Sequence, residues 1–541
     1  MHKDNQRLMT EVSKTYNVPR GTAYLTSQQV IIYITYFLFY VIIARILSKV
    51  EIGQVGLLAG AQAVFSAVTQ LALQPTATRY IASSIGIGKP TIAGSVAKSI
   101  LRLTLFTAGI GIVASILLSP LLAGVLFKAT EVGSEEALFY LIITFVSGFV
   151  LDLATLYGAF FLGAGMYAEA VYQNVLYVPL SRGLGLVLAL AGLSVLGITL
   201  GWAIGAVVML LLSIYLWKGK IPAAGLHPLK PLIAFTLPLF VSSLIITMQQ
   251  WGDIAILQAL LGQTGTTGGY YLIVQSVGFL SVLWMPVSSA LYPTLSAHSL
   301  GGRQALSEKV NLALRLINLA VLPLGVSLAA LSQTVLEIVY PGYASVAVPF
   351  AILTLATVLA AEAAILTVSL QAVGKTLSLL KVTLAATTVD LVSVALTARI
   401  LGPTAGALGR VLLALTTVIL ASWALRSTVN ASPRNGLSKA GSLALAMGLS
   451  LLIIDQLLVL FPISFSLPIS ILSLRFLIHF TTTSAISRLP ILSALFLGSF
   501  IGFSRSMRTF RPEDFTILRN MMPKPLHGLL KNFERMILYK D

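Results

Sequence analysis

The feature that most constrains this chain is a series of apolar runs, each about 20 residues or longer, that recurs from one end to the other. A helix of that length crosses the hydrocarbon core of a bilayer, where every backbone polar group must be satisfied within the protein. Hydrophobic residues make up 57% of the 541 and charged residues 10%, against roughly one quarter charged in soluble domains. The sequence therefore predicts an all-α, polytopic membrane protein.

Apolar length predicts spans that are joined by connectors too short to hold a soluble domain. Those before Arg426 are 22–44, 54–76, 99–121, 137–160, 168–192, 194–217, 231–253, 270–292, 311–332, 346–370, 378–400 and 404–425. A thirteenth follows at 439–461. Two weaker candidates remain, and an even number of spans favours 489–504 as the fourteenth, with 464–482 interfacial or re-entrant.

The basic residues behind the net charge of +17 predict orientation rather than nucleic-acid binding. With a cytoplasmic N-terminus, about 27 of the 35 Lys and Arg fall on the inner side. We expect a protein of the cytoplasmic membrane with both termini inside, in contact with membrane lipids. The arm at 1–21 is polar, and no cleavage site closes the run after it. Cysteine is absent, which excludes disulfides and thiolate chemistry.

Residues 53–103 and 269–316 share a layout at an offset of roughly 215 residues, the weak internal symmetry of duplicated transporter halves. Gly53 corresponds to Gly269 and Gln62 to Gln275, and a Gly-rich basic loop follows each run. The repeat predicts two six-helix lobes. The expected division is an arm at 1–21, an N-lobe at 22–217, a linker at 218–230, a C-lobe at 231–425, membrane helices at 426–504 and a basic cytoplasmic tail at 505–541.

Several predicted spans carry polar or aromatic side chains along one helical face. Lipid-facing stripes would be apolar, so these faces are expected to look toward neighbouring helices or a wet cavity. Helix–helix contact through hydroxyl groups is the structural alternative. Such stripes include Tyr33, Tyr36 and Tyr40 in the first span, Gln62, Ser66 and Thr69 in the second, and Ser281, Trp284, Ser288 and Tyr292 in the eighth.

Five carboxylates fall within the predicted spans. Charged side chains at that depth are costly and mark ion pathways or interhelical pairs. Asp253, Glu362 and Asp390 are the candidates for ion coupling, with H⁺ or Na⁺ as the ion, whereas Asp152 and Asp455 are weaker candidates. An ion pair is the structural alternative for Glu362 and Asp390, with Arg182 as a possible partner.

Sequence motifs for catalysis are missing. The stretch IGIGKPT at 85–91 fails as a phosphate loop because Ser83 stands where a glycine is required and Pro90 follows Lys89. No H-E-x-x-H, G-x-S-x-G or D-x-D occurs in the sequence. We expect no enzyme activity, no bound metal and no cofactor beyond the coupling ion.

Several stretches resemble a known family. They are ARILSKVEIGQVGL (44–57), QQWGDIAIL followed by GGYY (249–271), ALYPTLS (290–296) and QAVGKTLSLL (371–380). Over about residues 20–425 the chain is similar to the polysaccharide and lipid-linked oligosaccharide flippases of the multidrug/oligosaccharidyl-lipid/polysaccharide (MOP) exporter superfamily. The resemblance implies two lobes around a central cavity lined by spans 1, 2, 7 and 8, and alternating access.

The resemblance also implies a cationic site for a diphosphate head group. Arg45 and Arg182 are the candidates here, with Tyr33, Tyr36, Tyr40, Trp284 and Tyr292 expected to contact sugar or lipid; the first span has tyrosines where relatives carry a deep arginine. The expected activity is flipping of an isoprenoid-diphosphate-linked oligosaccharide by a monomer. Alternatives are a drug/cation antiporter of the multidrug and toxin extrusion (MATE) branch, or a membrane-embedded glycosyltransferase or polymerase.

Overall fold

A computed structural model describes residues 18–127, 133–222, 225–285, 287–288, 291–292, 295, 303–431, 437–462, 464–471, 474–481, 484–512, 514–515 and 527–538. Most of the predicted arm at 1–21 and parts of the linker and of the tail lie outside these residues. Within them, 12 helical segments are long and apolar enough to cross a membrane. One of these, Tyr167–Trp217, holds two of the spans expected from the sequence. The predicted all-α membrane fold is confirmed.

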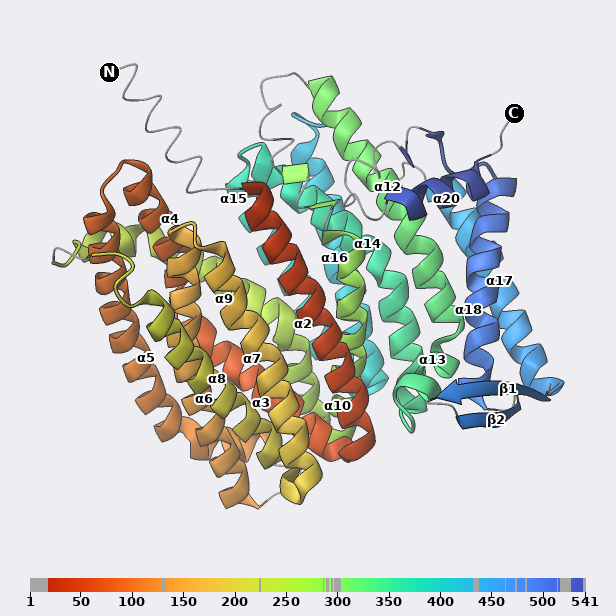
Figure 1. Ribbon diagram of the computed structural model, residues 1–541, viewed down its shortest axis with the longest axis horizontal. Helices are drawn as coiled ribbons and strands as arrows, with labels where there is room; N and C mark the ends of the chain where they lie inside the picture. Colours follow the sequence, from red (N-terminus) through yellow and green to blue (C-terminus); the bar gives the residue numbers. More distant parts are fainter. Residues whose placement is uncertain are drawn as a thin grey trace. The chain divides into compact units, whose positions relative to one another are not determined.

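The chain divides into two compact units, Met1–Leu272 and Ile273–Asp541. The first unit is helical throughout its described residues (Figure 1). Its elements are α2 (Val18–Ile46), α3 (Lys49–Thr69), α4 (Leu73–Gly86), α5 (Pro90–Leu126), α6 (Ser134–Gly163), α7 (Tyr167–Leu188), η1 (Ala189–Leu193), α8 (Ser194–Trp217), α9 (Leu229–Leu261) and the first turns of α10 (Thr264–Gly278).

The second unit continues with helices and one pair of strands. Its elements are the end of α10, η2 (Phe279–Leu283), α12 (Arg303–Ala330), α13 (Ser332–Val339), η3 (Ala344–Val346), α14 (Ala347–Ala372), α15 (Thr376–Leu401), α16 (Pro403–Leu425), α17 (Leu437–Leu460), β1 (Ser464–Ile471), β2 (Leu474–Thr481), α18 (Ala485–Ser506) and α20 (His527–Ile537). The sequence placed the division at the linker 218–230. The boundary between the two compact units falls at 272/273, with α9 packed against α3, and the division into two six-helix lobes stays a prediction.

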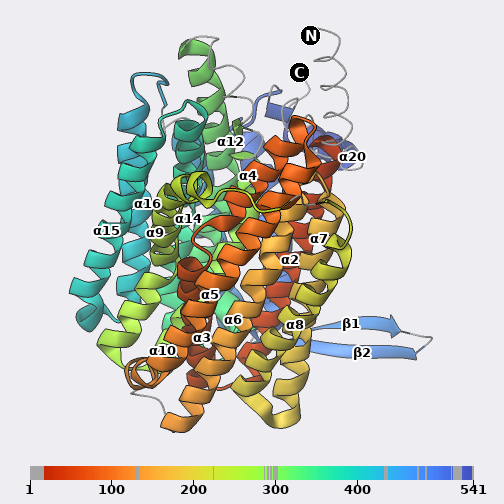
Figure 2. The same cartoon turned by 90° about the vertical axis from the view of Figure 1, so that its left-hand side faces the viewer.

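The segment predicted to be interfacial or re-entrant, 464–482, contains two β-strands rather than a helix. β1 and β2 pair antiparallel, with Ser464 opposite Thr481 and Ile471 opposite Leu474 (Figure 2). The order Ser-Phe-Ser-Leu-Pro-Ile-Ser-Ile alternates polar and apolar with a period of two, and its proline removes a helical hydrogen bond. Open strand edges cannot be satisfied in hydrocarbon, so this hairpin cannot be a span. α18 is the apolar helix that follows it, as predicted for 489–504.

The second predicted span, 54–76, is broken in the structure. α3 ends at Thr69 and α4 begins at Leu73, and between them Leu71 and Ala72 have φ of 46° and 56°. Two successive non-glycine residues in the left-handed region cost roughly 1 kcal/mol or more each. Broken helices at membrane depth are found where they line a cavity or a binding site.

Glycines allow the closest helix contacts of the first unit. A side chain at Gly53 of α3 would overlap the carbonyl oxygen of Thr264, and one at Gly268 would lie 2.6 Å from the backbone nitrogen of Gly53. Small residues at such crossings let membrane helices approach each other. Two helices that correspond in the sequence repeat, α3 and α10, therefore meet through their glycines.

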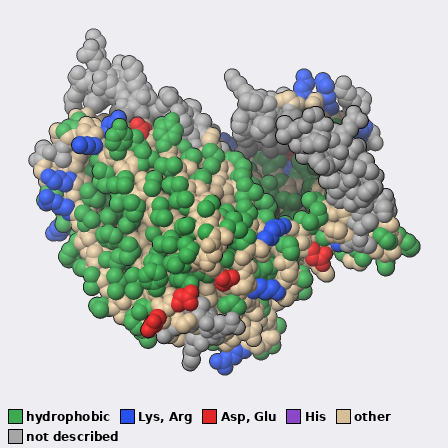
Figure 3. Space-filling model, turned by 60° about the horizontal axis from the view of Figure 1, so that its bottom comes forward, with side chains coloured by type: hydrophobic (Ala, Val, Ile, Leu, Met, Phe, Trp, Pro, Cys, Tyr) green, Lys and Arg blue, Asp and Glu red, His purple; other side chains and the backbone are tan. Residues whose placement is uncertain are grey.

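The outer surface is apolar. Large hydrophobic side chains such as Leu117, Leu396 and Ile400 are 75%, 74% and 82% exposed. In the space-filling view, apolar side chains cover most of the described surface, and charged ones are scattered over the rest (Figure 3). A soluble protein rarely exposes so much contiguous apolar surface, so this surface faces lipid.

Candidate functional site

The most unusual side chain of the first unit is Arg182, about four turns into α7. Its guanidinium carbon lies 5.1 Å from the ring centre of Tyr36, 5.3 Å from Phe39 and 4.8 Å from Trp202. Three aromatic faces thus surround one cation, and each contributes about 0.5–2 kcal/mol. α2 supplies two of the rings and α8 the third, so the packing of three helices builds the site.

The site holds buried hydrogen-bond donors that lack acceptors. Nη2 of Arg182 donates to the Tyr36 hydroxyl at 3.4 Å, whereas Nε and Nη1 are buried and have no hydrogen-bond partner among the described residues. The indole Nε1 of Trp202 is in the same condition. No described carboxylate of this unit forms an ion pair with Arg182. Buried donors are normally satisfied, so this arrangement is suited to an anion.

A row of aromatic side chains continues from the arginine. The ring of Tyr36 stacks on that of Tyr40 with centres 6.2 Å apart, and the hydroxyls of Tyr40 and Tyr271 lie 2.9 Å apart. Tyr271 in turn stacks on Trp251 at 6.1 Å. Helices α2, α9 and α10 supply the four rings. Aromatic faces beside an anion-binding group are suited to sugar rings and to prenyl chains.

The other residues predicted to bind substrate lie elsewhere on α2 and in the second unit. Tyr33 is half-buried one turn before Tyr36. Arg45 is exposed in the last turn of α2 and donates to the carbonyl of Val41 at 2.7 Å. In the second unit, Trp284 packs against a hydrophobic core, and Tyr292 is 46% exposed. The structure therefore groups Arg182 with Tyr36 and Tyr40 and does not bring Arg45 into that group.

Asp253, the first of the predicted ion-coupling residues, is fully buried in α9. It accepts hydrogen bonds from the Tyr270 hydroxyl at 2.6 Å and from the backbone nitrogen of Ile254 at 2.9 Å. These contacts connect α9 with α10. They are those of a buried carboxylate that joins two helices, and its role in coupling stays a prediction.

Glu362 and Asp390 are both buried in the second unit. Glu362 on α14 is hydrogen-bonded to Asn318 of α12, whereas Asp390 on α15 lies against Gly409 of α16. Consecutive helices joined by a short loop are usually neighbours, which would bring the two acids close together. Here α14 and α15 both pack mainly against α16, which separates them over much of their length. The two acids contact different helices, and the role of each in ion coupling stays a prediction.

Asp455 is held in an ion pair. Its Oδ1 lies 2.6 Å from Nη1 of Arg488, and its Oδ2 accepts from the Thr334 hydroxyl at 2.7 Å. Both charged side chains are buried, and they join α17 to α18. This pair is the structural alternative that the sequence left open for intramembrane acids.

Sequence reasoning missed several members of the site. Trp202, Trp251 and Tyr271 lie in apolar runs with no stripe that marks them, and only the packing of α8, α9 and α10 brings them together. Trp251 and Tyr271 did belong to the stretches that carried the family resemblance. Within the described residues, no group of three or more His, Asp or Glu is placed to hold a metal ion.

Solved structures of several transporters share this fold. One titled as the lipid II flippase MurJ in an inward closed conformation matches with a TM-score of 0.67 and 13% identity, over 89% of this chain and 98% of its own. An inward-facing MATE-family multidrug resistance transporter of the MOP superfamily matches with a TM-score of 0.59 and 16% identity, over 76% and 95%. A MOP transporter from Pyrococcus furiosus gives 0.54 and 16%, over 80% and 98%. The chain is a multi-pass membrane protein with the fold of the MOP exporters.

A family model described as polysaccharide biosynthesis protein matches residues 18–299, which is more than half of the chain. The chain belongs to this family. The resemblance found in the sequence is confirmed at this level. No curated protein sequence matches the chain significantly.

Proposed function

We propose that this protein is a flippase that moves an isoprenoid-diphosphate-linked oligosaccharide across the cytoplasmic membrane by alternating access, driven by an ion gradient. The observation that carries the proposal is Arg182, a cation with two buried nitrogens that have no acceptor, placed among aromatic rings. A diphosphate supplies the missing acceptors, and the row from Tyr36 to Trp251 offers faces for sugar or prenyl groups.

The charge of the site bears on the main alternative, a MATE-type antiporter for cationic drugs. A cation-binding site needs carboxylates or open aromatic faces. Here the faces of Tyr36, Phe39 and Trp202 are already occupied by the guanidinium of Arg182, and a second cation would be repelled. The family match to polysaccharide biosynthesis proteins points the same way.

The third alternative, a membrane-embedded glycosyltransferase or polymerase, has less support. Such chemistry requires a positioned acid or base, or a metal held by carboxylates. The described residues contain no group of three metal-binding side chains, and the relatives in the solved structures are named as flippases and transporters. We expect the chain to move its substrate unchanged.

Reconstitution in liposomes tests the proposal. The probe is a fluorescent prenyl-diphosphate-linked disaccharide, and flipping is measured as the fraction that an impermeant quencher can no longer reach. We expect the wild type to flip this probe. It should not accelerate flipping of a prenyl alcohol that carries the same dye and lacks the diphosphate. Uptake of a cationic dye such as ethidium without flipping of the diphosphate probe would favour the antiporter instead.

The proposed orientation places both termini in the cytoplasm. Because the chain has no cysteine, single cysteines in place of His2 and Lys540 can be labelled without background. An impermeant maleimide added to intact cells should label neither, and both should react after the cells are opened. Labelling of either position from outside would overturn the orientation.

A further inference from the structure

Asp152 is a fully buried carboxylate on α6 whose hydrogen-bond partners all come from the end of α3. Its Oδ1 accepts from the Ser66 hydroxyl and from the Gln70 side-chain amide, each at 2.6 Å, and its Oδ2 lies 2.5 Å from the Thr69 hydroxyl. All three partners are neutral. Among the described residues no ion pair includes Asp152. Buried charges in membrane helices are normally paired, so this carboxylate is an exception.

Helices α3, α4, α5, α7 and α8 pack against α6. Their charged groups form no ion pair with Asp152 among the described residues. Glu51 is bonded to Ser48 and Ser194, Arg79 lies over Phe235, and Arg182 lies among its three rings. Glu136 bonds Tyr140, Tyr80 donates to the carbonyl of Pro231, Tyr157 packs on Phe160, and Tyr177 packs near Arg182. The remaining titratable groups are exposed or half-buried: Lys49, Lys98, Arg102, Glu135, Tyr167, Glu169, Tyr172 and Tyr215.

The Thr69 hydroxyl can satisfy Asp152 in either protonation state. Its oxygen lies 2.9 Å from the carbonyl of Phe65 and 2.5 Å from Oδ2 of Asp152, yet a hydroxyl has one proton to donate. When Asp152 is ionised, Thr69 donates to the carboxylate. When Asp152 is protonated, its own O–H donates to Thr69, and Thr69 donates to Phe65. The same atoms thus serve a charged and a neutral aspartate without a change of position.

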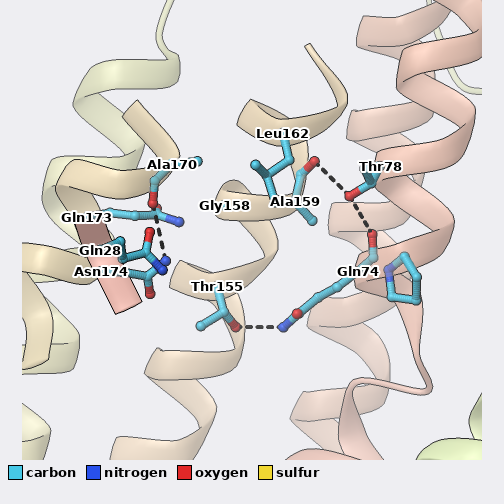
Figure 4. Close-up of a pocket in the computed structure, with 11 residues that line it drawn as sticks. Gln28, Gln74, Thr78, Thr155, Gly158, Ala159, Leu162, Ala170, Gln173 and Asn174 are labelled. Atoms are coloured by element: carbon cyan, nitrogen blue, oxygen red, sulfur yellow. Dashed lines mark hydrogen bonds between the residues drawn. The ribbon is translucent and has the colours of Figure 1, made fainter. Parts of the chain in front are cut away.

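A cavity that several polar side chains help to line lies a short hydrogen-bonded path from this carboxylate. The Gln74 amide donates to the side-chain oxygens of Gln70 and Thr155, at 2.8 Å each, and Gln70 bonds Asp152. Gln74 and Thr155 line a cavity of about 370 Å³ (Figure 4). Amide side chains of α2 and α7 line its other side, and the buried Oε1 of one of them, Gln28, has no hydrogen-bond partner among the described residues. A cavity of that size has room for several waters beside these polar groups.

We propose that Asp152 takes up and releases the proton that drives this transporter, with the cavity as its route to water. The left-handed residues at 71 and 72 lie directly after Gln70, so the strained break between α3 and α4 adjoins the carboxylate. A change in the charge of Asp152 would alter the contacts that hold the end of α3, and so connects protonation to the position of this break. The inference rests on the proposed flipping function and names its coupling ion and site.

Proteoliposomes under an imposed pH gradient test the coupling. With the wild type we expect the gradient to speed flipping of the diphosphate probe at least tenfold and a sodium gradient to have no effect. Asp152→Asn keeps the shape and cannot ionise. It should lose the response to pH and retain equilibrium exchange of the probe. Thr69→Val should reduce the response about tenfold, because it removes a hydrogen bond to a charged group, and Thr69→Ser should restore it.

Infrared difference spectra of the detergent-solubilised protein provide a measurement that needs no substrate. We expect a carboxylic-acid C=O band that titrates with pH in the wild type, is absent from Asp152→Asn and persists in Glu308→Gln, which removes an exposed acid. If the wild type shows this band but does not flip the diphosphate probe, the proposed flippase function is wrong, whereas the protonation of Asp152 is supported. A pH response retained by Asp152→Asn, or a wild type driven by sodium alone, would overturn the proposal.

Discussion

Replacing Arg182 with methionine separates binding from stability. Methionine fills a similar volume and removes the charge. The cation contributes three aromatic contacts at 4.8, 5.1 and 5.3 Å, worth about 2–4 kcal/mol together, against a desolvation cost of a few kcal/mol for a half-buried charge without a counter-ion. These terms nearly cancel. We therefore expect the free energy of unfolding of Arg182→Met to lie within about 1 kcal/mol of wild type.

Binding of the substrate should change much more. A diphosphate charge about 4 Å from the guanidinium is attracted by about 4 kcal/mol at an effective dielectric constant of about 20. Arg182 is half-buried, so we discount this to about 3 kcal/mol, which corresponds to roughly 100-fold in Kd. Arg182→Lys keeps the charge and loses the planar fork, so its loss should be smaller, about tenfold.

The assay is titration of purified protein with a short-chain prenyl diphosphate, followed by tryptophan fluorescence, together with thermal unfolding of each variant. Arg399→Met removes an exposed arginine from the last turn of α15 and is the matched control, with binding expected within about twofold of wild type. A strongly destabilised Arg182→Met that still binds the diphosphate normally would show that the arginine serves packing and would refute the reasoning.

Two further predictions concern stability. Arg488→Met leaves the buried Asp455 without its counter-ion and should lower the free energy of unfolding by about 3–5 kcal/mol. Adding Asp455→Leu should recover most of that loss in thermal unfolding. Equal losses for the single and double variants would show that the ion pair does not stabilise the protein. Gly53→Ala places a methyl group against the carbonyl of Thr264 and should cost about 1–3 kcal/mol, while Gly109→Ala, which meets no atom within 4 Å, should be neutral or slightly stabilising in the same measurement.

The sequence alone determined the class of structure, because few backbone structures can satisfy their own polar groups in lipid. Apolar runs of helical length cannot remain unfolded in hydrocarbon, so their number and the scarcity of charge are enough to predict a polytopic helical protein. The family resemblance was also readable, since it rests on glycine, proline and charge positions along the chain. The face of α2 that carries Tyr36 and Tyr40 followed from helical spacing, which is a local property.

The tertiary structure decided which of these residues act together. Arg182 was a candidate on charge alone, but the rings that surround it come from α2 and α8, and sequence spacing cannot place one helix against another. The alternation in 464–471 was visible in the sequence, yet pairing with 474–481 was needed to make it a strand. Asp152 ranked low as a sequence candidate because a carboxylate's role depends on its neighbours. Its neutral partners on α3, the break at 71 and 72 and the nearby cavity exist only once the helices have packed.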